Sequence, residues 1–321
     1  MNVSVIVCTY NRCKVLERTL KTVAEQDVPA ALSWEALVVD NRSTDDTAEV
    51  VRRFAEPHPV IRYVREETQG LSHARNRGIR EAEAELLCFV DDDVLLRPDY
   101  VASAYRAWQT GSWDIAGGRV LAQYEVVRPA WVDRLPARML NGPFGLHDHG
   151  EADQVTDPGG ELVPVGASML IPRATIEKLG EFNPELGRSG RNLRGGEDVD
   201  FYRRAQRAGM RMGYCGSCTL RHLVLADRLR RRYLLRWKYV SSVVGSNEVL
   251  PAGTRYWLRV PWFQWRRFAE SALALVGALV CGRRFLRLLE FVSELGAVIG
   301  YLTGRRTDTV DSTEHTGTPT S

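Results

Sequence analysis

Short apolar runs that alternate with helix-like segments constrain the fold of this 321-residue chain more than any other feature. The runs lie at Val3–Cys8, Ala36–Asp40, Ile61–Val64 and Leu86–Val90, and about 10 to 15 residues with helical spacing separate several of them. Such alternation predicts a mostly parallel sheet with right-handed crossovers and flanking helices. We therefore predict an α/β fold for the first part of the chain.

Composition excludes several classes of protein. Hydrophobic residues make up 44% and charged residues 26%, which is typical of a globular chain. A formal charge of +3 gives no case for nucleic acid as a partner, and a mean hydropathy of −0.25 argues against a polytopic membrane protein. The first residues lack the pattern of a secretory signal, so we expect a cytoplasmic protein.

The six cysteines are scattered, which favours buried thiols in a reducing compartment. Cys215 and Cys218 are the only close pair, and a zinc site or a redox disulfide is the alternative there.

Polar residues follow three of the apolar runs. These are the segments Thr9–Arg12, Asp40–Asp45 and Asp91–Asp93. In open parallel sheets the ligand crevice lies beyond the carboxyl ends of the strands. The sequence therefore places a candidate site at this edge, although a solvated sheet edge is also polar.

The acidic segment Asp91–Asp93 directly follows a strand-like run. Two carboxylates at i and i+2 can bind one hard divalent cation, and the cation would relieve the repulsion among three adjacent acids. His222 ends a later strand-like stretch and can supply a nitrogen ligand. A solvated acidic turn and a simply packed histidine remain the alternatives.

A second acidic pair, Glu197 and Asp198, follows Gly195 and Gly196 and begins a helical pattern. An exposed carboxylate behind a glycine loop can act as a general base, because the glycines let a substrate approach closely. Stabilisation of the helix N-terminus is the alternative role of these acids.

Six motifs in order resemble the family 2 glycosyltransferases, which have the Rossmann-like GT-A fold. The motifs are Thr9–Arg12, Asp40–Asp45, Gly70–Ile79, Phe89–Asp93, Gly195–Phe201 and Arg221-His222, spread over the first 70% of the chain. The resemblance implies an inverting transferase that moves a sugar from a nucleotide-diphospho donor, with UDP favoured, to a glycan, lipid-linked or small-molecule hydroxyl. It also implies Mg²⁺ or Mn²⁺ as cofactor.

The resemblance assigns a role to each motif. Asp198 would be the general base and Glu197 would orient the acceptor. Asp93 and Asp91 would bind the metal with His222, although Asp92 lies at the variable position of the DxD motif, which leaves the two metal-binding acids open. The donor would contact Thr9, Tyr10, Arg12, Asp40, Arg75, Asp91 and Asp92. The acceptor side would include Gly166, Ala167, Gly195 and Gly196.

Two other functions fit parts of this pattern. A sugar-nucleotide pyrophosphorylase also combines a parallel sheet with a metal, but the loop after the first strand, Thr9–Lys14, contains no glycine. A non-catalytic sugar-nucleotide-binding protein would lack the acidic turn or the base, and both are present.

We expect a catalytic domain over residues 1–225, with a donor half at 1–119 and an acceptor half at 120–225. A helical region would follow at 226–304, and a disordered tail at 305–321. The helical region is open to three interpretations: amphipathic helices on an anionic membrane surface, a packed helical subdomain, or one irregular spanning segment that would bury two arginines.

Overall fold

The computed structural model describes residues 1–157, 165–188, 195–246, 253–281 and 284–303. The chain divides into two compact units, residues 1–234 and 235–321. The division comes shortly after the boundary expected at residue 225, and the expected tail at 305–321 lies outside the described residues.

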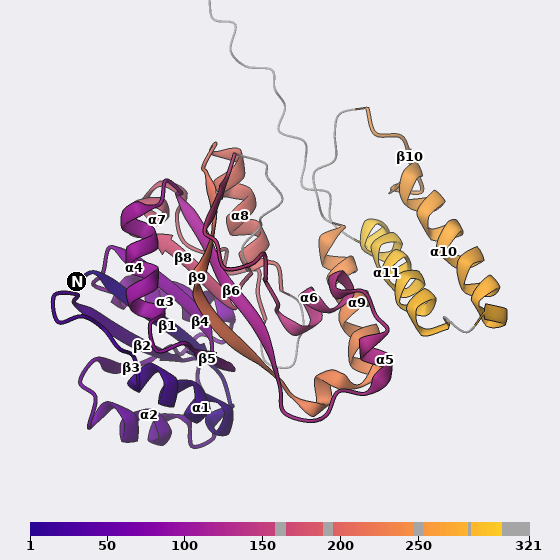
Figure 1. The fold of residues 1–321 in the computed structure, drawn as a ribbon. Coiled ribbons are helices and arrows are strands. Elements are labelled where there is room, and N and C mark those ends of the chain that lie inside the picture. Colours follow the sequence, from indigo (N-terminus) through magenta and orange to yellow (C-terminus); the bar gives the residue numbers. More distant parts are fainter. Residues whose placement is uncertain (158–164, 189–194, 247–252, 282–283, 304–321) are drawn as a thin grey trace, which may run out of the picture. The chain divides into compact units, whose positions relative to one another are not determined.

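A nine-stranded sheet forms the centre of the first unit among the described residues (Figure 1). Its order is β3-β2-β1-β4-β8-β6-β9-β5, and β7 pairs with β9. The strands are β1 (Val3–Thr9), β2 (Trp34–Asp40), β3 (Ile61–Arg65), β4 (Leu86–Asp91), β5 (Val94–Leu96), β6 (Ile115–Tyr124), β7 (Gln154–Thr156), β8 (Ser168–Pro172) and β9 (Met212–Val224).

The strands predicted from apolar runs form the parallel part of this sheet. β1 pairs in parallel with β2 and β4, and β2 pairs in parallel with β3. β8 runs antiparallel between β4 and β6, whereas the long strands β6 and β9 are parallel (Figure 1). The predicted α/β fold with a mostly parallel central sheet is confirmed. Since β4 has a neighbour on each side, its acidic end lies in the middle of the sheet edge.

Helices cover both faces of the sheet because alternate strand residues point to opposite sides. Val3, Val5 and Val7 pack in a core cluster with α1, α2 and α4, whereas Ile6 packs in a second cluster with α3, α7 and α8. The helices of this unit are α1 (Cys13–Ala24), α2 (Thr47–Ala55), α3 (Leu71–Glu81), α4 (Tyr100–Thr110), α5 (Ala130–Asp133), α6 (Ala137–Phe144), α7 (Arg173–Leu179), α8 (Glu197–Arg207) and the 3₁₀ helix η1 (Ala226–Leu229).

The cysteine prediction is wrong for one pair. Cys215 and Cys218 form a disulfide, whereas Cys8, Cys13 and Cys88 are free. The disulfide closes a bulge of β9, where the partner of Gly118 is Cys215 but the partner of Arg119 is Thr219. The bulge brings two side chains of one strand close together, which spacing alone does not reveal.

Regular elements continue between Ile115 and Thr156. β6 continues to Tyr124, and α5, α6 and β7 follow. β8 begins at Ser168, and residues 158–164 lie outside the described part of the chain. Pairing with β9 extends β6 despite its two glycines, because sheet context outweighs local propensity.

The second unit is helical. It contains most of α9 (Arg231–Gly245), a hairpin of β10 (Tyr256–Trp257) and β11 (Val260–Pro261), α10 (Trp262–Cys281) and α11 (Arg284–Thr303). Gly296 and Gly300 let α11 approach α9 closely, since an added Cβ would lie 2.6 Å from the Tyr239 carbonyl oxygen at the first position and would overlap the Ser246 hydroxyl at the second. Phe268 of α10 packs on Phe291 of α11.

None of the helices in the described ranges has both the length and the apolar character needed to cross a bilayer.

Candidate active site

The acidic turn lies between β4 and β5. Asp91 is the last residue of β4 and pairs with Cys8 in the parallel register, so the turn lies beside the loop that follows β1. Asp92 and Asp93 are buried, whereas the Asp91 side chain is 37% exposed. The turn therefore presents one accessible carboxylate and two enclosed ones.

Residues after β1 hold the Asp92 carboxylate. Thr9 Oγ1 donates to Asp92 Oδ2 at 2.7 Å, and Arg12 Nη1 donates to Asp92 Oδ1 at 2.5 Å. Burial raises the pKa of Asp92 to about 6, against the opposing charge of Arg12. The position between the two outer acids is thus a structural anchor for the turn.

Three basic side chains surround Asp93. Arg12 Nη2 and Arg228 Nη2 lie 2.8 Å and 2.7 Å from Oδ2, and His222 Nε2 lies 3.2 Å from Oδ1. Burial alone would raise the pKa of Asp93, but the charges of His222, Arg12 and Arg228 outweigh it and hold this pKa well below its usual range. Asp93 is therefore ionised at neutral pH.

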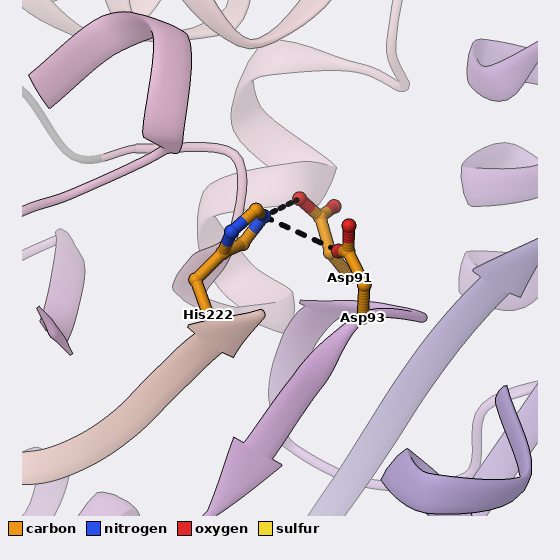
Figure 2. Close-up of side chains that lie close together, drawn as sticks. All are labelled: Asp91, Asp93 and His222. Atoms are coloured by element: carbon orange, nitrogen blue, oxygen red, sulfur yellow. Dashed lines mark ion pairs between the residues drawn. The ribbon is translucent and has the colours of Figure 1, made fainter. Parts of the chain in front are cut away.

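Asp91, Asp93 and His222 form a candidate metal site. Figure 2 shows the imidazole at the end of β9 facing both carboxylates, with Nε2 3.8 Å from Asp91 Oδ2. One ligand atom from each residue lies within 4.8 Å of the others. Neighbouring ligands of an octahedral cation lie about 3 Å apart, so small movements would let these atoms share one ion. The two carboxylates are ligands that suit Mn²⁺ or Mg²⁺, and the imidazole is the softer ligand of the three.

A second charged cluster joins α3 to the start of α8. Arg75 Nη1 donates to Glu197 Oε1 at 2.7 Å, and both side chains are buried. Burial raises the pKa of Glu197, although Arg75 opposes this shift. The other carboxylate oxygen, Oε2, is buried and has no hydrogen-bond partner among the residues that the structure describes.

Asp198 lies at the edge of this cluster and is half-buried. A Cβ added to Gly166 would lie 2.9 Å from Asp198 Oδ2 and 3.3 Å from Arg75 Nη2. Burial lowers the pKa of Arg75, but the charges of Glu197, Asp198 and Asp91 outweigh this and raise it. The positive charge of Arg75 therefore acts on carboxylates of both the acidic turn and the first turn of α8.

The other predicted residues lie around these two clusters. Asp40 is buried at the end of β2, where Oδ1 accepts from the Ser43 amide and Oδ2 from the Tyr63 hydroxyl. Tyr10 is half-buried, and Ala167 is buried beside Gly166. Gly196 has φ of 108° and precedes α8, and Gly195 lies near Glu197 Oε2. The structure leaves the predicted roles of these residues as predictions.

Sequence analysis missed Arg228. Its side chain is only 16% exposed and pairs with Asp93. The position six residues after His222, in a 3₁₀ turn that directly follows β9, is the only sequence signal for this role.

Residues 4–180, more than half of the chain, match the family described as Glycosyl transferase family 2. The chain is 45% identical over 106 residues to a validoxylamine A glucosyltransferase of Streptomyces hygroscopicus, which covers 32% of this chain and only 25% of that protein. It is 25% identical over 308 residues to the succinoglycan biosynthesis protein ExoM of Rhizobium meliloti, covering 94% and 93% of the two chains.

The fold resembles the mannosyltransferase PcManGT of Pyrobaculum calidifontis, solved with GDP-Man and Mn²⁺. The TM-score is 0.58 at 20% identity, and the match covers 92% of this chain and 87% of that one. This likeness supports the GT-A fold.

Proposed function

The chain belongs to glycosyl transferase family 2, and from this premise we propose that it transfers a sugar from a nucleoside-diphosphate donor to an acceptor hydroxyl with inversion of the anomeric carbon. The main support is that Asp198 lies beside Gly166, and Gly166 comes two residues before Ser168, the partner of Val90 in the sheet. Asp198 is therefore at the edge of the sheet where β4 ends in Asp91. One cleft would then hold a leaving-group site and a candidate base.

The donor would lie across the carboxyl ends of β1, β2 and β4. In this arrangement Thr9, Tyr10 and Asp40 line the nucleoside side, and Arg12 holds the acidic turn through Asp92 and Asp93. We propose a uridine, guanosine or thymidine diphosphate sugar, with uridine favoured. The GDP-Man bound to the similar mannosyltransferase keeps guanosine among the candidates.

Asp91, Asp93 and His222 would hold a divalent cation, which as a Lewis acid would neutralise charge on the departing diphosphate. His222 also contributes without the ion, since Nε2 lies 3.2 Å from Asp93 Oδ1 and helps to keep that carboxylate ionised. Arg228 places a further positive charge beside the Asp93 carboxylate.

Asp198 would accept the proton of the acceptor hydroxyl. A positioned base contributes roughly 10²- to 10⁴-fold to a reaction of this kind. Cys8 lies beside Asp91 in the sheet, but burial raises the pKa of its thiol to about 12, so it remains protonated at neutral pH. A single displacement with inversion requires only one base at the acceptor hydroxyl, and this is the role proposed for Asp198.

The acceptor would be a hydroxyl of a glycan, a lipid-linked sugar or a small molecule. The relatives include a validoxylamine A glucosyltransferase and a succinoglycan biosynthesis protein, so both a small molecule and a glycan are candidate acceptors. The family assignment favours transfer over the pyrophosphorylase and the non-catalytic alternative.

A donor panel tests this proposal. Thermal unfolding would be followed with UDP-, GDP- and dTDP-sugars, with Mn²⁺, with Mg²⁺ and with a chelator. One donor should raise the melting temperature in a metal-dependent way, because a ligand that binds only the folded state stabilises it. That donor should then be hydrolysed slowly to the nucleoside diphosphate. Failure of every donor to bind would refute the proposal.

A further inference from the structure

The second unit carries an exposed cluster of aromatic, aliphatic and basic side chains at the β10–β11 hairpin and the start of α10. We name it the aromatic–basic patch, and its members are Arg255, Tyr256, Trp257, Leu258, Arg259, Trp262 and Phe263. Trp257, Leu258 and Trp262 are 53%, 61% and 58% exposed. Single exposed apolar residues are ordinary, but a contiguous group marks an interaction surface.

The hairpin holds its apolar tip outward at a cost in backbone strain. Leu258 and Arg259 have φ of 49° and 66°, in the left-handed region that glycine and asparagine normally fill in such turns. A leucine there is strained and also fails to bury its side chain. Strained positions of this kind cluster at functional sites.

Internal contacts order the patch. The Trp257 and Trp262 rings stack with centroids 6.4 Å apart, and the Trp262 amide donates to the Arg255 carbonyl oxygen. Trp265 contacts the hairpin as well, since its indole N–H donates to the Trp257 carbonyl oxygen at 3.0 Å. A pre-ordered surface loses little conformational entropy on binding.

The charge of the unit indicates the partner. Residues 235–303 contain nine Lys or Arg and four Asp or Glu. No carboxylate within the described ranges forms an ion pair with Arg255 or Arg259, and both side chains are exposed.

The helix α10 also has an exposed apolar side. Leu273 and Val276 lie about three and four turns beyond Trp262 on the same side of this helix, and they are 73% and 64% exposed. Basic charge and an apolar helix face thus occur in one element.

We propose that the aromatic–basic patch docks this protein on an anionic membrane surface. Indole and phenol rings suit the headgroup region because they combine an apolar body with a polar edge, and guanidinium groups bind anionic lipids there. Leu258 would enter the acyl boundary, and the exposed side of α10 would lie along the surface. An aliphatic tip flanked by two arginines favours this partner over a neutral glycan stacked on the tryptophans.

Flotation of the full chain with vesicles tests the docking. The protein should float with phosphatidylcholine vesicles that contain 30–40% phosphatidylglycerol, a roughly physiological to high anionic load, and not with pure phosphatidylcholine. Binding should weaken as salt rises from about 0.05 to 0.5 M, because screening shortens the electrostatic range. Leu258→Asp should lower partitioning at least about tenfold, whereas Val127→Asp, at an exposed position of the first unit, should not.

A second variant guards against misfolding of the hairpin. Arg255→Gln with Arg259→Gln keeps every apolar side chain and should also weaken binding to anionic vesicles, with an unchanged circular dichroism spectrum. Equal binding to neutral and anionic vesicles, absence of binding, or full binding by both variants would overturn the proposal. So would tryptophan fluorescence that responds to neutral oligosaccharides but not to vesicles. Donor binding by the first unit is measured in a separate experiment. Failure of the proposed reaction can therefore be told apart from failure of membrane docking.

Discussion

Arg75 and Glu197, separated by 122 residues in the chain, form a buried ion pair with Nη1 2.7 Å from Oε1. The pair fixes α3 against the first turn of α8. Arg75 and Asp198 also both lie beside Gly166, so the pair positions the part of the candidate site that contains Asp198.

Arg75→Ala should strongly destabilise the protein. The substitution leaves the Glu197 carboxylate buried without its partner, and within the described ranges one of its oxygens already has no hydrogen-bond partner. Loss of one partner of a buried pair costs about 3–5 kcal/mol. Denaturant unfolding would measure this, and the double variant Arg75→Ala/Glu197→Ala should lose less than the sum of the single variants. Arg97→Ala, which breaks an exposed pair with Asp99, should cost at most about 1 kcal/mol.

His222→Ala should weaken binding of Mn²⁺ to the donor-free protein. Loss of a partner that only orients a metal ligand costs about 10- to 100-fold in affinity, so loss of a direct ligand should cost at least as much. Electron paramagnetic resonance of free Mn²⁺ measures the affinity without any turnover. His58→Ala provides a control far from the acidic turn in sequence. Unchanged Mn²⁺ affinity in the first variant would refute the candidate metal site.

Asp92→Asn should change how stability depends on pH. The pKa of Asp92 is raised to about 6 in the folded protein, so the folded state holds this proton more tightly than the unfolded state does. The resulting stability is fully present below about pH 4 and is lost as pH rises to 6. The variant has no such proton, so the stability of the wild type relative to the variant should fall between pH 4 and 6 and then level off.

Thermal unfolding of both proteins in the presence of a chelator measures this difference. Asp93, whose lowered pKa acts in the opposite direction, remains in both proteins. A difference that stays constant, or that grows with pH, would contradict the assignment of the raised pKa to Asp92.

Gly166→Ala should impair transfer more than donor binding. The backbone of Gly166 does not require glycine, but the added Cβ would press on Asp198 Oδ2 at 2.9 Å. Displacement of a catalytic group by a fraction of an ångström to 1 Å lowers turnover by roughly 10- to 100-fold. Steady-state kinetics would show the loss in kcat. Gly277→Ala, which meets no neighbour on α10, should leave kcat unchanged and stabilise the helix by about 0.5–1 kcal/mol.

Local patterns predicted the parallel half of the sheet because its strands are short apolar runs, three of which are followed by a polar segment. Asp91 and Thr9 are close in space for that reason: adjacent parallel strands end at the same edge. The same rule does not predict the position of Arg228, because its contact with Asp93 depends on the course of the chain after β9.

Side-chain pairing across long separations is set by packing, which spacing does not encode. Arg75 was expected to contact the donor, and its buried partner Glu197 was expected to orient the acceptor, but their ion pair was not anticipated. A disulfide between Cys215 and Cys218 was only an alternative in the sequence, since the bulge that brings the thiols together forms when β9 pairs with β6.

Asp198→Asn should abolish transfer while donor binding persists. Asp198 lies next to Arg75 but does not belong to the cluster that holds the acidic turn, so an amide should disturb neither the turn nor the fold. The amide cannot accept a proton at neutral pH, so turnover should fall by roughly 10²- to 10⁴-fold. Thermal shift with the donor should match the wild type. Asp200→Asn, which loses a contact with Arg204 on the same helix, is the matched control and should retain turnover. Near-normal turnover by Asp198→Asn would show that another residue is the general base.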